Sequence, residues 1–281
     1  MIEAKIIADS ISESGKRITT LQVKFHRFIL PEFNTHRVFS RNFSSSRAIP
    51  TAKLLEQVRN DPALPVHWGK NQAGMQANEQ LDDMTREAVK AQWINAAQHA
   101  AHYAESMSLL GTHKQIVNRV IEPWLWAHGV MTATEFDNWD ELRAHPDAQP
   151  EIHELAERMI EARKASTPRL LKAGEWHLPY ITDQERNDSF YQIEANKNSN
   201  MLAKISAARC CRVSYLKHDG TSPNVDEDLF LFQRLAGSVP LHASPLEHQA
   251  TPLSDAFAPS GNFLGWTQYR KLWEHEIYNT K

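Results

Sequence analysis

A run of hydrogen-bond donors lies between residues 35 and 50. It holds three arginines, a histidine, five hydroxyl side chains and an asparagine: Thr35, His36, Arg37, Ser40, Arg41, Asn42, Ser44, Ser45, Ser46 and Arg47. Guanidinium groups carry a fixed positive charge and match the geometry of phosphate oxygens, and hydroxyl groups add further donors. A hydrophobic core does not accommodate so many polar and charged side chains. The run predicts an anion-binding loop, and a solvated Ser/Arg loop is the alternative.

Two further clusters of polar side chains lie far along the chain. One comprises residues 118–123 and the stretch 132–152, which contains Arg143. The other comprises residues 206–215 and the segment 242–248, which reads His-Ala-Ser-Pro-Leu-Glu-His. Each cluster is a weak signal when taken alone, but their combination in one chain is specific.

Together the three clusters resemble the sequence motifs of the flavin-dependent thymidylate synthases. The family signature R-H-R-x-x-S-x-N-E-x-S-x-R corresponds to residues 35–47, and its A-R-x-x-L-P helix corresponds to 118–123. The family pattern that ends in A-Q-x-E-I is matched from Thr132 to Ile152. Its A-A-R-V-S-[FY] motif is matched loosely at 208–215, and H-x-[ST]-[PV]-F-E-H is matched well at 242–248. The resemblance covers roughly residues 17–50, 113–164 and 200–250.

The resemblance implies an α+β fold, with a central antiparallel sheet packed against long helices in a single catalytic domain over residues 1–281. In the family, however, the motif matched at 242–248 precedes the arginine-rich motif, whereas here it follows. This order predicts a circular permutation, with the cut just before the strand at 18–25, because permutation is tolerated where termini lie close together. Residues 165–200 would then be the connecting segment, and 255–281 a C-terminal extension.

The family reaction is the reductive methylation of dUMP to dTMP, with FAD as the cofactor and with NADPH and methylenetetrahydrofolate as co-substrates. By matching positions, the resemblance implies three overlapping sets of site residues. Those important for activity are Arg143, Ser45 and His242. The flavin set is His36, Arg37, Thr132, Thr134, Asn138 and Ser244, and the nucleotide set is Glu32, Ser44, Ser45, Ser46, Arg47, Arg119 and Arg143.

Several positions depart from the family pattern. Thr35 replaces the first signature arginine, Phe43 replaces the signature glutamate, and Glu32 replaces a glutamine. Thr132 and Thr134 stand where the family has asparagine and arginine. These changes leave a second reading open, in which a divergent relative modifies C5 of a pyrimidine differently, for example by hydroxymethylation.

Two further possibilities concern residues near the C-terminus and the class of protein. Gln268 and Arg270, near the C-terminus, could supply the missing glutamine and arginine functions. A different class of protein, a non-catalytic nucleotide- or RNA-binding protein whose Ser/Arg loop grips phosphates, is the third reading. The retention of both Arg143 and the His242 motif argues against it, because binding alone would not need both.

The elements that position these residues follow from hydrophobic periodicity and from helix and turn signals. We expect strands at 2–8 and 17–29 joined by a turn at 12–15, and a short helix from Pro50. Helices are expected at 77–110, at 113–126 with a bend near Pro123, and at 134–143, 150–164, 204–213 and 226–236. Residues 60–74 read as a loop, 167–200 as an irregular connecting segment, and 237–265 as a segment rich in proline, serine and glycine. The alanine-rich stripe of 77–110 suggests close packing in the core or between subunits, and we expect a homo-oligomer, a tetramer by the resemblance.

The bulk properties exclude several classes of protein. A net charge of −3 and a pI of about 6.5 provide no global basic field, so no nucleic-acid partner is expected. No apolar run approaches the ~20 residues of a membrane helix, and the first residues do not resemble a signal peptide. The adjacent Cys210 and Cys211 have no third cysteine to pair with, and no metal site is expected. We therefore expect the protein to be located in the cytoplasm, or in the cytoplasm of a host cell if the chain is phage-encoded.

Overall fold

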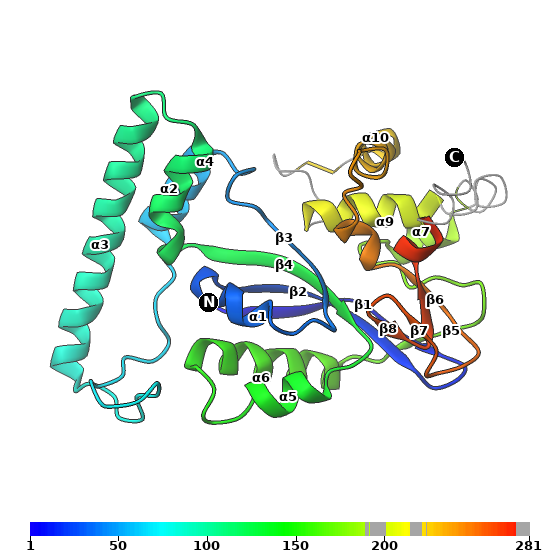
Figure 1. The fold of residues 1–281 in the computed structure, drawn as a ribbon, viewed down its shortest axis with the longest axis horizontal. Helices are drawn as coiled ribbons and strands as arrows, with labels where there is room; N and C mark the ends of the chain where they lie inside the picture. The colour runs from blue at the N-terminus through cyan, green and yellow to red at the C-terminus, as the bar shows by residue number, and fades with distance from the viewer. Residues whose placement is uncertain (189–190, 192–200, 214–220, 223, 274–281) are drawn as a thin grey trace.

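A computed structural model of the protein describes residues 1–188, 191, 201–213, 221–222 and 224–273. Its centre is a five-stranded sheet in the order β3-β4-β2-β1-β5. All neighbouring strands are antiparallel except β1 and β5, which are parallel. Helices pack around this sheet, so the expected mixture of helix and sheet is confirmed (Figure 1). The strands are β1 (Glu3–Ser12), β2 (Arg17–His26), β3 (Ser40–Phe43), β4 (Trp126–Ala133) and β5 (Arg169–Leu171).

The first two strands form the predicted hairpin. The backbone N–H of Ser12 donates to the carbonyl of Lys16 at 2.9 Å, and Gly15 adopts a φ of 83°, which glycine tolerates without steric cost. The second strand is shorter than predicted, because Arg27–Ile29 turns into a 3-10 helix (η1) and then into α1 (Leu30–Phe33). This turn places Glu32 at the start of the donor-rich loop.

The strand β4, which lies between β3 and β2, was not predicted from the sequence. The helix expected at 113–126 is wrong, since α4 covers only Lys114–Val117 and a 3-10 helix (η2) follows at Asn118–Trp124. Pro123 cannot continue a regular helix, and the chain extends from Trp126. Because β2 and β3 flank this strand and seven of its eight residues are buried, its sequence lacks the alternation typical of a half-exposed strand.

Two helices cover one face of the sheet. They are α5 (Asp137–Arg143) and α6 (Pro150–Ala165), and in Figure 1 they lie below the strands. The α6 helix agrees with the prediction for 150–164: Pro150 occupies the first turn, where its missing N–H costs nothing. The buried side chains of Ile152, Leu155 and Met159 join Phe25 of β2 in the largest core cluster. Arg143 therefore ends a helix whose position is fixed by a well-packed neighbour.

The last third of the chain forms a second packed region. The predicted helices appear as α9 (Met201–Arg212) and α10 (Val225–Ala236), which pack against each other. Additional short elements lie within or just after the segments expected to be irregular. These are α7 (Asp183–Asn187), the 3-10 helix η3 (Ser244–Glu247), β6 (Ala250–Pro252), β7 (Pro259–Ser260), β8 (Phe263–Leu264) and β9 (Trp266–Gln268).

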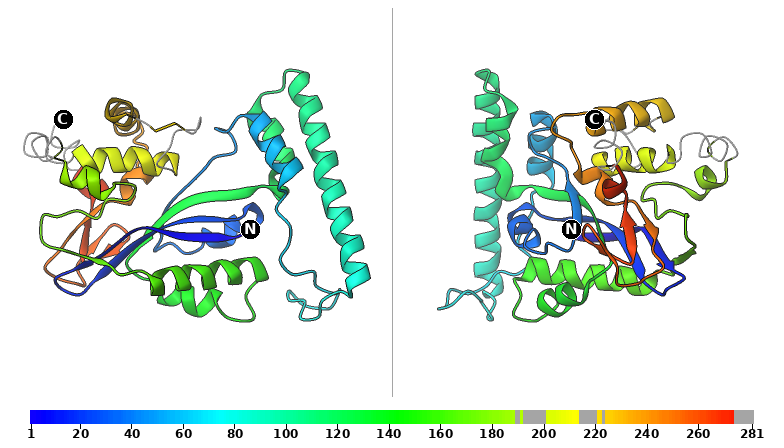
Figure 2. Two further views of the ribbon diagram at one scale, coloured as in Figure 1. Left: turned by 180° about the vertical axis from the view of Figure 1, so that it is seen from behind. Right: turned by 45° about the vertical axis from the view of Figure 1, so that its right-hand side comes forward.

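The long helix α3 (Asp83–Leu109) stands at one end of the sheet beside α2 (Thr51–Asn60) (Figures 1 and 2). It begins later than predicted, because the Asp82 side chain accepts a hydrogen bond from the Thr85 N–H and caps it. The alanine stripe is buried only in the C-terminal half of the helix, at Ala97, Ala101 and Ala104. At the other end Met84 is 83% exposed. None of the described helices is long and apolar enough to cross a membrane.

Candidate functional site

A cavity of about 880 Å³ opens where the loop after β3 meets α9, α10 and the segment before η3. Four predicted site residues line it, namely Ser44, Ser45, Arg47 and His242. They come from segments about 200 residues apart in the sequence, so the fold brings the first and third clusters together. Other residues that line this cavity include Gln115, Cys211 and Arg212, which were not predicted as site residues.

One side chain ties the first cluster to the third. The Asn42 Nδ2 group donates to the carbonyl oxygens of Cys210 at 2.9 Å and Cys211 at 3.3 Å. Its Oδ1 atom accepts a hydrogen bond from the Ser244 hydroxyl at 3.1 Å. Asn42 belongs to the signature stretch, Cys210 to the motif at 208–215 and Ser244 to the motif at 242–248. These contacts hold the three motifs beside one cavity.

The 3-10 helix η2 holds residues 44–49, here called the serine loop, in place. The Asn118 Nδ2 group donates to the carbonyls of Ser46 at 2.7 Å and Ile49 at 3.2 Å. The Ser46 hydroxyl donates to Glu122 Oε1 at 2.7 Å, and Ser46 is buried. The predicted phosphate contact of this hydroxyl would require that bond to break, whereas Ser44 and Ser45 face the cavity. Ser46 therefore fixes the loop that presents its two neighbours.

The guanidinium of Arg119 is engaged by the same carboxylate. Its Nη1 atom lies 2.8 Å from Glu122 Oε1, and Arg27 Nη2 lies 3.0 Å from that oxygen. Burial raises the pKa of the Glu122 carboxyl, but hydrogen bonds from Ser46 and Arg119 and the charge of Arg27 outweigh it, so the pKa is lowered. Arg119 lines a separate cavity of about 610 Å³ and not the cavity that Arg47 lines.

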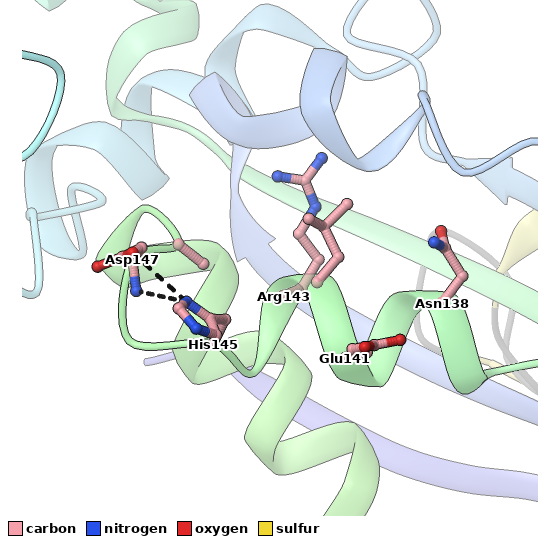
Figure 3. Close-up of a pocket in the computed structure, with 7 residues that line it drawn as sticks. Asn138, Glu141, Arg143, His145 and Asp147 are labelled. Atoms are coloured by element: carbon pink, nitrogen blue, oxygen red, sulfur yellow. Dashed lines mark hydrogen bonds and ion pairs between the residues drawn. The ribbon is translucent and has the colours of Figure 1, made fainter.

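Arg143 lies at a third cavity, of about 440 Å³, which Asn138 also lines (Figure 3). Its side chain rises from α5 toward the donor-rich loop, where Nε donates to His36 Nε2 at 2.9 Å. His36 is 6% exposed, and its pKa is lowered to about 4, mainly by burial and then by the positive charges of Arg143 and Arg41. His36 is therefore neutral, with Nε2 as the acceptor. Within a single chain, three different cavities are lined by Arg143, by Arg119, and by Arg47 together with His242.

The six predicted flavin residues do not form one pocket in a single chain. His36 is bonded to Arg143, Thr134 Oγ1 accepts from the Leu264 N–H at 3.0 Å, and Thr132 is fully buried. A flavin contact of the Thr132 hydroxyl would require the sheet to open. Arg37, Asn138 and Ser244 are exposed, but no cavity in the described part of the chain contains all three. Within one chain these six residues therefore do not form a flavin site.

Glu32, which departs from the family pattern, and the two residues proposed to compensate, Gln268 and Arg270, do not line the cavity of about 880 Å³. Glu32 on α1 keeps a buried Oε2 atom with no hydrogen-bond partner among the described residues. Gln268 is 2% exposed and donates to Ser40 Oγ at 3.0 Å and to the Glu247 carbonyl at 3.2 Å. Arg270 forms an ion pair with Glu247. Gln268 thus braces β3, and its predicted role toward a ligand stays a prediction.

A buried cluster of charged side chains adjoins the cavity through Arg212, and the sequence did not predict it. Asp228 on α10 is fully buried and pairs with Arg212 and, at 3.1 Å, with Arg209 Nε. Arg209 also binds both carboxylate oxygens of Glu185, at 2.6 and 2.9 Å. An aspartate in the first turn of an amphipathic helix is an ordinary capping signal, so nothing in the local sequence distinguishes Asp228.

Five buried side chains form a hydrogen-bonded chain that links β1, β2 and β4. His177 Nδ1 lies 2.9 Å from Ser10 Oγ, and His177 Nε2 lies 2.8 Å from Thr20 Oγ1. Thr20 Oγ1 lies 2.6 Å from Thr132 Oγ1, which in turn lies 2.9 Å from His248 Nδ1. Both histidines are fully buried, and burial lowers the pKa of each to about 3.

These two histidines should make the fold sensitive to mild acid. Below pH 6.5 the unfolded chain binds protons at both rings, whereas the folded chain does not until about pH 3. Stability is therefore complete above pH 6.5 and falls as the pH decreases, by about 1.4 kcal/mol per pH unit for each histidine. Urea unfolding at pH 7, 6 and 5 measures this slope. His248→Asn should lower the slope between pH 6 and 5 by about 1.4 kcal/mol per pH unit, and substitution of the exposed His145 should leave it unchanged. An unaltered slope in His248→Asn would contradict the assignment.

Within the described ranges, no group of three or more histidine, cysteine, aspartate or glutamate side chains is placed to hold a metal ion. Of the two cysteines, Cys210 is buried, and Cys211 borders the cavity of about 880 Å³. Burial raises the pKa of both thiols.

Comparison with known proteins gives similarity of structure only. No family model matches the sequence, and no curated protein matches it. A thymidylate synthase X from Helicobacter pylori, solved with FAD and dUMP, has a TM-score of 0.39 and 18% identity over 52% of this chain and 67% of that chain. The UMP/dUMP methylase PolB from Streptomyces cacaoi, bound with 5-Br dUMP, has a TM-score of 0.47 and 14% identity over 58% of this chain and 90% of that chain. The same methylase bound with 5-Br UMP gives 0.46 and 14% over 58% and 88%.

The resemblance read from the motifs is thus accompanied by similarity to structures of flavin-dependent thymidylate synthase and of a dUMP methylase. At these values the similarity is a likeness of fold over part of the chain. The comparisons do not address the order of the segments, so the circular permutation stays a prediction. The functional argument rests on this chain's own residues.

Proposed function

We propose that this protein is a flavin-dependent enzyme that modifies C5 of a pyrimidine nucleotide. The favoured reaction is the reductive methylation of dUMP to dTMP, with FAD as the cofactor and with NADPH and methylenetetrahydrofolate as co-substrates. The observation that carries the proposal is the Asn42 contact set, which joins three motifs distant in the sequence beside one cavity. Chance matches to unrelated motifs would have no reason to converge.

In this proposal the nucleotide phosphate binds at the serine loop. Ser44 and Ser45 provide hydroxyl donors, and Arg47 provides a positive charge that has no ion pair among the described residues. Hydrogen bonds from ionised donors to phosphate oxygens are stronger than neutral ones, which suits a dianionic ligand. His242 borders the same cavity and can bond a nucleotide atom through either ring nitrogen.

Arg143 reaches such a nucleotide only if another copy of the chain supplies it. In one chain it lies at a different cavity from Ser45 and Arg47. We therefore propose a homo-oligomer in which a site combines residues of neighbouring copies, with a tetramer expected from the family. The outer face of α3, which includes the exposed Met84 and Tyr103, is free to form a contact. When bound at such a shared site, FAD would supply the hydride, and Arg37, Asn138 and Ser244 are the exposed residues left to hold it.

A divergent C5 modification is the second candidate, and the position of Phe43 favours it. This residue replaces the family's signature glutamate, and its ring lies 5.5 Å from Phe25 and 5.4 Å from Phe33 while also lining the cavity. Gly129 provides the space, because a Cβ atom there would collide with the Phe43 ring. An aromatic wall in place of a carboxylate changes what the cavity selects, and hydroxymethylation is one outcome.

The test is a reconstituted reaction with dUMP, methylenetetrahydrofolate, NADPH and FAD, in which mass spectrometry reads the nucleotide product. A mass increase of one methyl group supports thymidylate synthesis, and addition of a hydroxymethyl group supports the second candidate. Binding of dUMP without flavin binding and without any product would overturn both, and would indicate the non-catalytic nucleotide-binding protein. Arg47→Gln, which keeps a polar side chain but lacks the charge, is the matched negative control.

A further inference from the structure

We propose that Arg212 binds a carbonyl oxygen of the pyrimidine base when a nucleotide occupies the cavity of about 880 Å³. This inference rests on the proposed function, and it names the group that reads the base. The resemblance provides no such role for Arg212. It assigns Arg143 to the nucleotide, and the Arg143 guanidinium donates to His36 at another cavity.

The first argument is an unpaired donor. Arg212 lines the cavity, its side chain is only 9% exposed, and its Nε–H group is buried without an acceptor among the described residues. A buried donor with no partner costs free energy, and folded proteins rarely leave one. The guanidinium has five N–H donors and no acceptor, so the missing partner must be a hydrogen-bond acceptor. A ligand oxygen in the cavity supplies one when the guanidinium turns toward it, because the Nε atom has no exposed surface in the unliganded chain.

The second argument is the charge around Arg212, which selects a neutral oxygen over a phosphate oxygen. Arg209 and Arg212 face the carboxylates of Asp228 and Glu185, so the four formal charges cancel. Arg212 therefore offers a directed N–H group with little net positive charge. A carbonyl oxygen needs only the donor, whereas a phosphate dianion gains most from an uncompensated cation.

The third argument is the polarity of the cavity itself. Glu227 lines it on the α10 side, and its carboxylate accepts the Asn224 N–H at 3.0 Å. That negative charge disfavours a phosphate beside Arg212. Arg47 and the two serines lie on the β3 loop and attract it instead. The nucleotide is thereby oriented with its phosphate at Arg47 and its base toward Arg212.

The test compares two ligands on two variants by equilibrium binding. The ligands are dUMP and 2-deoxyribose 5-phosphate, which carries the phosphate but no base. Arg212→Lys keeps a cation beside Asp228 but lacks the planar N–H fork, so it should weaken dUMP binding about tenfold. Its affinity for 2-deoxyribose 5-phosphate should stay within about twofold of wild type. Arg47→Gln should weaken binding of both ligands, and thermal melting verifies that each variant is folded.

The outcomes distinguish a failure of this inference from a failure of the proposed function. Equal losses for both ligands in Arg212→Lys would overturn the base contact, and so would an unchanged affinity for dUMP. In either case the proposed function stands, provided that wild type binds dUMP. Failure of the wild-type protein to bind dUMP would overturn both.

A second measurement uses the wild-type chain and does not depend on the folding of a variant. Cys211 lines the cavity and directly precedes Arg212 in the sequence, whereas Cys210 is fully buried. Labelling of Cys211 therefore reports whether a ligand occupies the Arg212 side of the cavity. At a ligand concentration ten times Kd, dUMP should slow iodoacetamide labelling of Cys211 about tenfold. 2-Deoxyribose 5-phosphate at the same occupancy should leave labelling unchanged, and equal protection by both would contradict the proposed orientation. Cys211→Ser, which should take up no label, is the control.

Discussion

Co-assembly of an Arg47→Gln chain with an Arg143→Ala chain should restore activity that neither variant has alone. Arg47 lines the cavity of about 880 Å³ and Arg143 lines a different one, so a site that uses both must combine two copies. A random mixture of the two chains unites both intact residues in about one site in four, so about a quarter of the wild-type rate is expected. The variants are co-expressed with different tags, purified through both tags, and assayed for nucleotide product.

The control for this experiment is a chain that carries both substitutions. Paired with wild type, it gives the same subunit mixture, and its activity shows whether mixing alone alters the rate. Recovery in the first pair shows that the two arginines act across subunits. Verified mixed oligomers with no recovered activity would contradict the shared site and would leave Arg143 without a role at this nucleotide.

Replacing Asp228 with alanine should give the largest loss of stability. The change leaves Arg212 without a carboxylate partner and removes one of two carboxylates from Arg209, while both guanidinium groups stay more than nine-tenths buried. Breaking one partner of a buried ion pair costs about 3–5 kcal/mol, because an uncompensated charge remains inside. That is a large share of the ~5–15 kcal/mol that stabilises a typical domain. Urea unfolding at pH 7 measures the difference.

A matched control is available on the surface. Glu79 pairs with Lys70 at 3.4 Å, and both side chains are largely exposed. Glu79→Ala removes the same kind of group and should leave the unfolding midpoint unchanged, since exposed ion pairs contribute little. If Asp228→Ala were as mild as Glu79→Ala, the buried cluster of charged side chains would not hold α9 and α10 together.

Elements with strong local signals were predictable. The α6 helix has Pro150 in its first turn and buried Ile152, Leu155 and Met159 on one face, so caps and periodicity agree. The hairpin turn needed only Gly15. The strand β4 was not predictable in this way, because neighbours on both sides bury it and its sequence carries no period-two pattern. Its existence depends on β2 and β3, which no local window contains.

The residues of the candidate site likewise include some that were predictable from the sequence and some that were not. The serine and arginine types at 44–47 predicted an anion-binding loop, and the structure places Ser44, Ser45 and Arg47 at a cavity. Ser46 carries the same local signal, yet its hydroxyl is bonded to Glu122, 76 residues away. Arg212 carried no usable signal, because its significance depends on Asp228 and on one unpaired N–H group. Such long-range partners are fixed by packing and cannot be read from spacing.

The measurement that tests the account most directly is a crystal structure of the protein with dUMP. The account predicts that the phosphate lies between Ser44, Ser45 and Arg47, and that a base carbonyl lies within hydrogen-bonding distance of Arg212 Nε. A well-ordered nucleotide elsewhere, for example at the cavity lined by Asn138 and Arg143 of the same chain, would contradict the central claim that the convergence of the three motifs creates the nucleotide site.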